Sequence, residues 1–436
     1  MDVLMQSLGE ASVLLSLAIA LVGGLVLSRI VKRFGMPAVT GYLIAGILVG
    51  PFCLGALGID GIGFTSLENA EEYGILSDLA LGFIAFAIGN EFRLSELKET
   101  GKAAAVIGCF QALTATFVVD AALIGLHFII GGEMSLPVAI TLGAIATATA
   151  PAATLMVVKQ YKAKGKLTKL LLPIVALDDA VGLIVFAASF GVARALQNGN
   201  ANMTAIVVEP LVEIFGSLLL GFLMGLLLSY AEKMFTSGSK RLCLAVTAVT
   251  FTVALSMLKM EIGGIHVGFS SLLVCMMLGT VFCNVCDFSA DIMDRADKWT
   301  MPIYILFFVL SGAELDLSIL TNGTVVLIGI IYIATRSIGK YGGAYLSART
   351  MKLDKKVTNN LGITLLPQAG VALGMCMTAA AELGNDGQTI RNIVLFGVLI
   401  YELVGPTLTK GALMRAGDIT PRPATPHDKD QRQKNK

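Results

Sequence analysis

Long stretches of apolar residues make up most of the chain, and short clusters of charged residues, Pro and Gly separate them. Three of the longest runs, Ala11 to Leu27, Ala103 to Val119 and Ile214 to Leu228, are with their flanks long enough to cross a bilayer as helices. The whole pattern predicts an all-α polytopic membrane protein with about 13 transmembrane helices. The predicted segments run approximately over residues 11–31, 37–50, 74–92, 103–128, 135–158, 167–193, 206–231, 241–258, 264–285, 299–312, 322–347, 357–381 and 392–409.

Lys and Arg residues gather on alternate connections between these segments, as expected when the cytoplasmic loops carry the positive charge. The opposite connections hold only Arg194, Lys259 and Arg391, and an acidic stretch from Glu68 to Glu72. Because the number of segments is odd, this pattern places the N-terminus outside and the C-terminus in the cytoplasm. The basic connections lie at residues 29–33, 93–102, 159–169, 233–241, 295–298, 349–356 and 410–436.

The composition, with 55% hydrophobic and 14% charged residues, excludes an ordinary soluble domain. The 47 Gly residues suit closely packed membrane helices. A net charge of +1 indicates no nucleic-acid partner, and seven Cys residues, mostly inside apolar segments, argue against a disulfide framework. We expect a transmembrane domain over residues 1–416 and a polar, Pro-containing, disordered cytoplasmic tail over residues 417–436.

Asp178 and Asp179 stand in the middle of the sixth apolar segment, with apolar or small residues on both sides. An ionisable group at this depth costs several kcal/mol, so the pair invites a functional interpretation. Successive helical residues point about 100° apart, so one carboxylate can face a cavity while the other meets a neighbouring helix. Desolvation and mutual repulsion both disfavour two ionised carboxylates, so a proton and a small cation can compete there. This chemistry predicts an antiport site, and the alternative is a structural, hydrogen-bonded pair.

Two basic residues, Arg336 and Lys340, fall inside the eleventh segment. They are four residues apart and therefore share a helix face, and the Gly residues around them permit close packing. We expect Lys340 to pair with one of the aspartates, because a Lys can release its proton when its environment changes, and Arg336 to be structural. The alternative for Lys340 is that its side chain extends to the cytoplasmic surface.

Helix breakers interrupt the fifth and twelfth segments at mid-depth, at Thr147-Ala-Thr-Ala-Pro151 and at Leu366-Pro-Gln-Ala-Gly370. Interrupted backbone inside a bilayer is tolerated where it is buried in protein or lines a cavity, and the half-helix ends can coordinate ions. The breaks lie seven segments apart, which puts them in opposite orientation, as inverted-topology repeats require. The pattern therefore predicts two discontinuous helices, and the alternative is a pair of Pro kinks without function.

Five motifs are spread over nearly the whole length of the chain. They are Thr40-Gly-Tyr-Leu-Ile-Ala-Gly-Ile-Leu-Val-Gly-Pro51, Ala148-Thr-Ala-Pro151, Leu177-Asp-Asp-Ala180, Gly339-Lys340 and Leu366-Pro-Gln-Ala-Gly-Val-Ala-Leu-Gly374. In combination they resemble the bacterial monovalent cation:proton antiporters of the sodium/proton exchanger superfamily, in its Kef-like branch. The resemblance places the chain in a bacterial inner membrane.

The resemblance implies a core ion-transport bundle, which would include about residues 103–193 and 322–409. Two discontinuous helices would cross within it beside the aspartate pair. The remaining helices would form a dimerisation or scaffold domain, so a homodimer and elevator-like transport are expected.

The same resemblance implies roles for individual residues. Asp179 is the expected principal ion carrier, Asp178 the partner of Lys340, and Thr149 with nearby carbonyls would line the site. Members with two aspartates are expected to move more protons than cations. Ala150 stands where relatives often have Ser, and the missing hydroxyl leaves cation selectivity open. The remaining broken-helix elements are Thr147, Pro151, Pro367 and Gln368.

We therefore predict a transporter, not an enzyme, which exchanges protons for Na⁺ or Li⁺, with K⁺/H⁺ exchange as the nearest alternative. No cofactor is expected, and no metal beyond the transported monovalent cation. An intramembrane aspartyl protease is a remote alternative, because its two acids must activate one water and normally come from different helices. A channel or a non-transporting sensor with the same fold is a further alternative.

Overall fold

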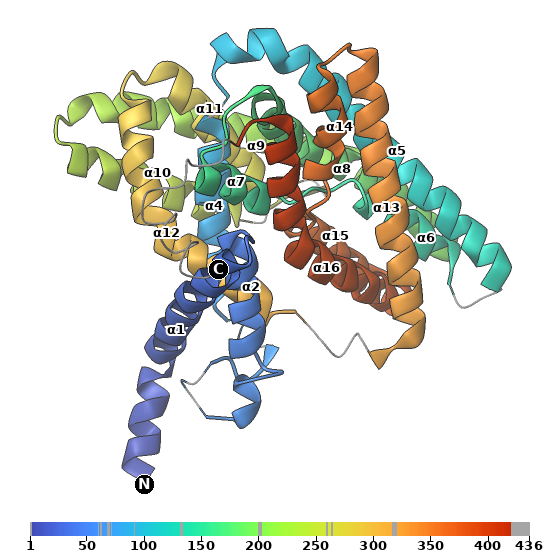
Figure 1. Ribbon diagram of the computed structural model, residues 1–436, viewed down its shortest axis with the longest axis horizontal. Coiled ribbons are helices and arrows are strands. Elements are labelled where there is room, and N and C mark those ends of the chain that lie inside the picture. Colours follow the sequence, from blue (N-terminus) through green and yellow to red (C-terminus); the bar gives the residue numbers. More distant parts are fainter. Residues whose placement is uncertain are drawn as a thin grey trace, which may run out of the picture.

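The computed structural model describes residues 2–59, 61, 63–67, 70, 72–90, 92–130, 134–198, 203–258, 260–262, 265–315 and 321–419. Nearly all of this part of the chain is helical, and the helices form one bundle (Figure 1). The α-helices are α1 (Asp2–Arg33), α2 (Ala38–Val49), α4 (Gly74–Asn90), α5 (Leu94–Ile130), α6 (Leu136–Ile145), α7 (Pro151–Tyr161), α8 (Lys166–Asn198), α9 (Met203–Ala231), α10 (Gly238–Ser256), α11 (Ser271–Val285), α12 (Ser289–Ala313), α13 (Gly323–Thr350), α14 (Lys355–Thr364), α15 (Gly370–Glu382) and α16 (Gly384–Ala416).

Each predicted segment corresponds to one helix, or to a pair of short helices in the fifth and twelfth segments, as the helix breakers predicted. Within the described residues, α1, α5, α8, α9, α10, α13 and α16 contain a stretch long and apolar enough to cross a membrane, and five shorter helices are apolar as well. The fold is that of an all-α polytopic membrane protein, while the count of 13 transmembrane segments stays a prediction.

The ninth segment begins later than the sequence predicted. The strands β1 (Met260–Ile262) and β2 (Ile265–Val267) form a short antiparallel hairpin, and α11 starts only at Ser271. Gly263, Gly264 and Gly268 disfavour a helix here, because Gly loses more backbone freedom than other residues when a helix forms. Within the described residues, the remaining elements are two short 3₁₀ helices, η1 (Gly55–Leu57) and η2 (Glu232–Met234).

The buried apolar side chains divide the helices into two groups. One cluster is built mainly from α1, α2, α4 and α9 to α12, which we call the scaffold helices. Two further clusters are built mainly from α5 to α8 and α13 to α16, which we call the core helices. In Figure 1 most scaffold helices lie on the left of the view and most core helices on the right, with α7 beside α4 and with α13 running along α5. The core helices include residues 103–193 and 322–409, for which the sequence analysis expects the ion-transport bundle, and this division into domains stays a prediction.

The basic connections of the chain meet at one face of the bundle. Lys159 at the end of α7 lies 2.5 Å from Asp297 of α12, and Lys166 at the start of α8 lies 3.4 Å from Asp354 before α14. At the opposite face, Arg194 of α8 lies 2.9 Å from Glu382 of α15. We call these the basic face and the opposite face. The charge pattern predicts that the basic face is cytoplasmic.

Residues directly after α16 also pack at the basic face. The Asp418 Oδ2 atom accepts hydrogen bonds from Thr168 N at 2.6 Å and from Thr168 Oγ1 at 2.7 Å. Asp418 therefore caps the first turn of α8, where backbone N–H groups lack partners within the helix. The predicted disordered tail, 417–436, thus includes residues 417–419 that pack against the bundle, and residues 420–436 lie outside the described part of the chain.

Candidate functional site

The two broken helices cross at their interruptions. The chain is not helical between α6 and α7 or between α14 and α15, and Ala150 N donates a hydrogen bond of 2.8 Å to Pro367 O. Gln368 Nε2 donates a bond of 3.0 Å to Ile145 O, the last residue of α6. The structure therefore brings two segments more than 200 residues apart into direct contact, through a backbone and a side-chain hydrogen bond.

Proline explains why both helices stop at this depth. Pro151 is the first residue of α7, where its missing N–H and fixed φ are well tolerated, and Ala150 before it is extended, with φ −81° and ψ 104°. Pro367 lies within the second break, two residues after Leu365 caps α14 and three residues before α15 begins at Gly370. The side chains of Pro367 and Gln368 are buried. Both predicted breaks thus lie in the interior of the protein.

Arg336 of α13 connects the two breaks through hydrogen bonds to their backbone. Its guanidinium donates to Ala146 O at 3.0 Å, to Ala148 O at 2.5 Å and to Leu366 O at 2.7 Å, and it lies over the ring of Tyr401 at 4.5 Å. Each of these carbonyls belongs to backbone that a continuous helix would have satisfied. Arg336 therefore replaces the hydrogen bonds that the breaks remove.

Lys340, one turn further along α13, forms a buried ion pair with Asp178 of α8. The Lys340 Nζ atom lies 2.7 Å from Asp178 Oδ2, and neither side chain is exposed. Lys340 also donates to Thr147 O, and to Thr149 Oγ1 at 2.6 Å. Thr149 in turn donates to Asp178 Oδ2. Lys340 therefore reaches the first broken helix as well as the aspartate.

Gln111 of α5 completes this network, and the sequence analysis missed it. Its Nε2 atom donates to Asp178 Oδ1 at 2.5 Å, so both oxygens of the carboxylate accept hydrogen bonds. Gly339 and Gly343 of α13 make this possible, because a Cβ on either would lie 2.7 Å from the Cα of Ala115 or Gln111 on α5. In the sequence, the indication of this role is that Gln111 is a polar residue inside the fourth apolar segment.

Asp179 follows Asp178 in α8, and its side chain lies outside the described residues. The neighbouring turn of α8 packs closely against the first break, since a Cβ on Gly182 would lie 2.9 Å from Thr147 Oγ1. The Thr147 hydroxyl donates to Ala144 O at 2.7 Å. The role of Asp179 as ion carrier stays a prediction.

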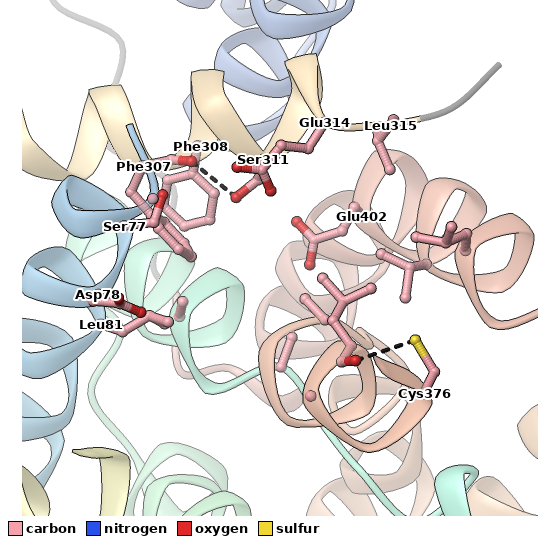
Figure 2. A pocket seen from close by; sticks show the side chains of 18 of the residues that line it. Ser77, Asp78, Leu81, Phe307, Phe308, Ser311, Glu314, Leu315, Cys376 and Glu402 are labelled. Atoms are coloured by element: carbon pink, nitrogen blue, oxygen red, sulfur yellow. Dashed lines mark hydrogen bonds between the residues drawn. The ribbon is translucent and has the colours of Figure 1, made fainter. Parts of the chain in front are cut away.

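A cavity of about 440 Å³ lies between the scaffold and core helices (Figure 2). Ala150 and Pro151 contribute to its lining, so it reaches the first break. Gly74 and Arg391, near the starts of α4 and α16, line it toward the opposite face. Its polar and charged lining residues also include Ser77, Asp78, Ser311, Glu314 and Glu402.

Four further ionisable residues, Asp120, Glu213, His266 and Glu402, fall within the apolar segments. Asp120 lies behind α6, where a Cβ on Gly143 would be 1.7 Å from its Oδ1 atom. Glu402 lines the cavity and is buried, and Glu213 on α9 is half-buried. The side chain of His266 lies outside the described residues. None of the described three contacts the ion pair through a hydrogen bond that the structure shows.

Comparisons with known proteins agree with this architecture. The family model described as sodium/hydrogen exchanger, transmembrane, matches residues 17–415. The chain is 24% identical over 420 residues to the K(+)/H(+) antiporter subunit KhtU of Bacillus subtilis, covering 94% of each chain. It is 24% identical over 390 residues to the Na(+)/H(+) antiporter NhaS4 of Synechocystis, covering 87% of this chain and 92% of the relative.

Solved structures show the same fold. The sodium proton antiporter MjNhaP1 of Methanocaldococcus jannaschii at pH 8 superimposes with a TM-score of 0.68 at 18% identity, covering 92% of this chain and 97% of that chain. A second structure of the same antiporter gives a TM-score of 0.73 at 19% identity, covering 93% of this chain and 98% of that chain.

Proposed function

The chain belongs to the sodium/hydrogen exchanger family, and on that premise we propose that it is a secondary active antiporter that exchanges protons for Na⁺ or Li⁺ at Asp178 and Asp179. Its relatives and structural neighbours are cation/proton antiporters, so the chain is a membrane transporter and the intramembrane protease alternative is wrong. The site chemistry and the cation are our proposal.

The buried pair of Lys340 and Asp178 carries this proposal. In the cation-free state the Lys340 ammonium neutralises Asp178, which otherwise would be a costly isolated charge in the interior. A monovalent cation that enters between the aspartates takes over this role and releases a proton from Asp179. Lys340 then loses its counter-ion and can release its own proton. More protons than cations would move in each cycle, so transport would be electrogenic.

Alternating access would come from movement of the core helices against the scaffold helices. The crossing, Arg336 and the ion pair all belong to core helices, so they can move together without breaking the hydrogen bonds that connect them. The cavity between the two groups supports a route to the site from the opposite face. An elevator-like motion would close this route and open one toward the basic face. We further propose a homodimer held by the scaffold helices.

Potassium is the second candidate cation. Relatives at equal identity are named for different ions, K⁺ for KhtU and Na⁺ for NhaS4. Ala150 lines the cavity beside the break and offers no side-chain oxygen to a cation. Sodium remains our first choice, and the transport assay discriminates between the two.

The test measures proton movement in proteoliposomes with an imposed pH gradient, with sodium, lithium and potassium salts added in turn. Sodium or lithium should dissipate the gradient, and Asp179→Asn should abolish the effect. A response to potassium alone would establish the alternative cation. No response to any cation, with protein correctly inserted, would support the non-transporting sensor and overturn the proposal.

A further inference from the structure

Glu402 of α16 is a buried carboxylate that the proposed mechanism does not use. The residue is 3% exposed, and its Oε1 atom has no hydrogen-bond partner within the described part of the chain. A carboxylate in such a place costs several kcal/mol unless it holds a proton or pairs with a cation. A buried carboxyl group at this position therefore indicates that Glu402 binds a proton or a cation.

The side chain of Glu402 points into the cavity described above (Figure 2). Arg391, Leu395, Val398 and Glu402 form one stripe of α16 along its wall. Eleven residues of helix separate the ends of this stripe, so Glu402 lies about 16 Å further from the opposite face than Arg391. Glu402 is thus the deep acidic group of the cavity.

The backbone around Glu402 lies against the second broken helix. A Cβ on Gly405, one turn later, would be 2.9 Å from Pro367 Cγ, and a Cβ on Gly397 would be 3.8 Å from Gln368 Oε1. Tyr401 next to Glu402 lies over Arg336, which holds the crossing. An ion that reaches Glu402 from the opposite face is therefore close to the transport site.

The lining of the cavity favours a cation. Asp78 of α4 and Glu314 after α12 contribute two more carboxyl groups, while Arg391 supplies one positive charge. When all three acids are ionised, the cavity has a net negative charge, which attracts cations from solution. Its volume of about 440 Å³ also accommodates water around the ion.

We propose that Glu402 is the deep ligand of an outer cation site, where a monovalent cation and a proton compete for its carboxylate before the ion moves on to the aspartate pair. This inference rests on the proposed antiport function and adds a second binding station to it. A cation bound to Glu402 would lie close to the crossing while the aspartate pair is still protonated.

Other ionisable groups near Glu402 influence the competition between cation and proton through their charges. On the cavity side these are Asp78, Glu314, Cys376 and Arg391. Other helices packed against α16 carry charged residues that already have partners. Arg336 binds carbonyls at the crossing, Lys340 and Asp178 form the buried ion pair, and Lys159 pairs with Asp297 at the basic face. The remaining titratable residues of these neighbours are Tyr42, Tyr161, Tyr332, Tyr341, Tyr345, Lys355, Lys356, Lys166, Lys169, Asp179, Arg194, Arg349 and Glu382.

Carbodiimide labelling of the wild-type protein tests the competition directly, because the reagent adds to protonated buried carboxyl groups. The tryptic peptide from Asn392 to Lys410 contains Glu402 as its only acidic side chain, so mass spectrometry assigns the modification without ambiguity. We expect labelling that falls as the pH rises, and at fixed pH falls when sodium, lithium or potassium chloride replaces choline chloride. Absence of labelling at every pH, or labelling that no cation reduces, would overturn the outer site.

Transport by Glu402→Gln provides the second test. We expect the cation concentration for half-maximal exchange to rise about tenfold with the maximal rate largely kept, as for the loss of one charged ligand at a loading site. Glu382→Gln, an exposed acid at the same face, is the matched control, and Glu402→Asp should restore part of the affinity. An unchanged half-maximal concentration in Glu402→Gln would refute the outer site. A wild type that exchanges no cation would instead refute the antiport proposal, and the labelling result would then stand alone.

Discussion

Lys340 Nζ lies 2.7 Å from Asp178 Oδ2 in the interior of the bundle, where neither side chain is exposed. Removal of one partner from a buried ion pair leaves an uncompensated charge and typically costs about 3–5 kcal/mol. Lys340→Ala should therefore lower the melting temperature of the purified protein, while removal of both charges in Lys340→Met with Asp178→Asn should recover part of the loss. Thermal unfolding of the wild type and of these two variants measures this. If Lys340→Ala has the stability of the wild type, the pair does not support the fold.

Asp179→Asn should abolish cation-dependent proton movement while the protein still folds and inserts. The substitution keeps the size of the side chain but removes the charge that a proton or cation neutralises. Proteoliposome transport checks activity, and size-exclusion chromatography checks folding. Asp291→Asn, at an exposed ion pair of α12, is the matched control and should transport normally. Exchange by Asp179→Asn at the wild-type rate would remove this residue from the mechanism.

Arg336→Lys should destabilise the crossing although it keeps the positive charge. A Lys ammonium cannot reproduce the planar set of donors that serves Ala146, Ala148 and Leu366, and each buried carbonyl left without a donor costs about 1–3 kcal/mol. We expect a lower melting temperature together with reduced exchange. Arg295→Lys, at the exposed pair with Asp291, should change neither quantity. Wild-type stability of Arg336→Lys would mean that other groups hold the two breaks together.

Lys159 and Asp297 connect a core helix to a scaffold helix at the basic face, 2.5 Å apart. If the core helices move during transport, a flexible thiol cross-link between Cys residues at these two positions should stop exchange, and a reducing agent should restore it. The exposed native residues Cys53, Cys109 and Cys243 are first replaced by Ser.

The matched control places the cross-link between positions 291 and 295, both within α12, and should leave exchange intact. Full activity with the link between positions 159 and 297 closed would argue against the elevator-like motion.

Asp418→Ala should lower stability by about 1 kcal/mol, the usual value of a helix N-cap, because Thr168 at the start of α8 loses the acceptor for its N–H and hydroxyl groups. Two truncated chains test whether the cap itself contributes this stability. A chain ending at Ile419 keeps the cap and should melt like the full chain, whereas a chain ending at Ala416 should melt at a lower temperature. Equal melting temperatures for both truncations would show that the cap is dispensable.

Local signals along the chain predicted much of the site. Pro151 and Pro367 each stand in a short run of small and polar residues within an apolar segment, and this combination predicted both breaks. A proline alone does not end a helix here, since Pro173, Pro302 and Pro406 lie inside α8, α12 and α16. The four-residue spacing of Arg336 and Lys340 requires a shared helix face, and the Gly residues nearby indicated close packing. The cost of charge in a bilayer singled out the aspartates.

Other features depend on which helices meet, and no local pattern contains that information. The sequence did not reveal Gln111 as a ligand of Asp178, because α5 reaches it only through the close approach of Gly339 and Gly343 on α13. The Asp418 cap joins residues 250 positions apart, so its partner on α8 could not be inferred.

By itself the sequence determined the membrane-spanning character of this protein, the two interruptions and the ionisable residues that must be buried, because each follows from hydrophobicity, backbone chemistry or the desolvation of charge. Only the tertiary structure decided that the interruptions touch, that Arg336 holds three of their carbonyls, and that Glu402 faces a cavity. These features depend on contacts between segments that are distant in the sequence. Such contacts form where the packing of all the helices provides hydrogen-bond partners for the buried polar groups.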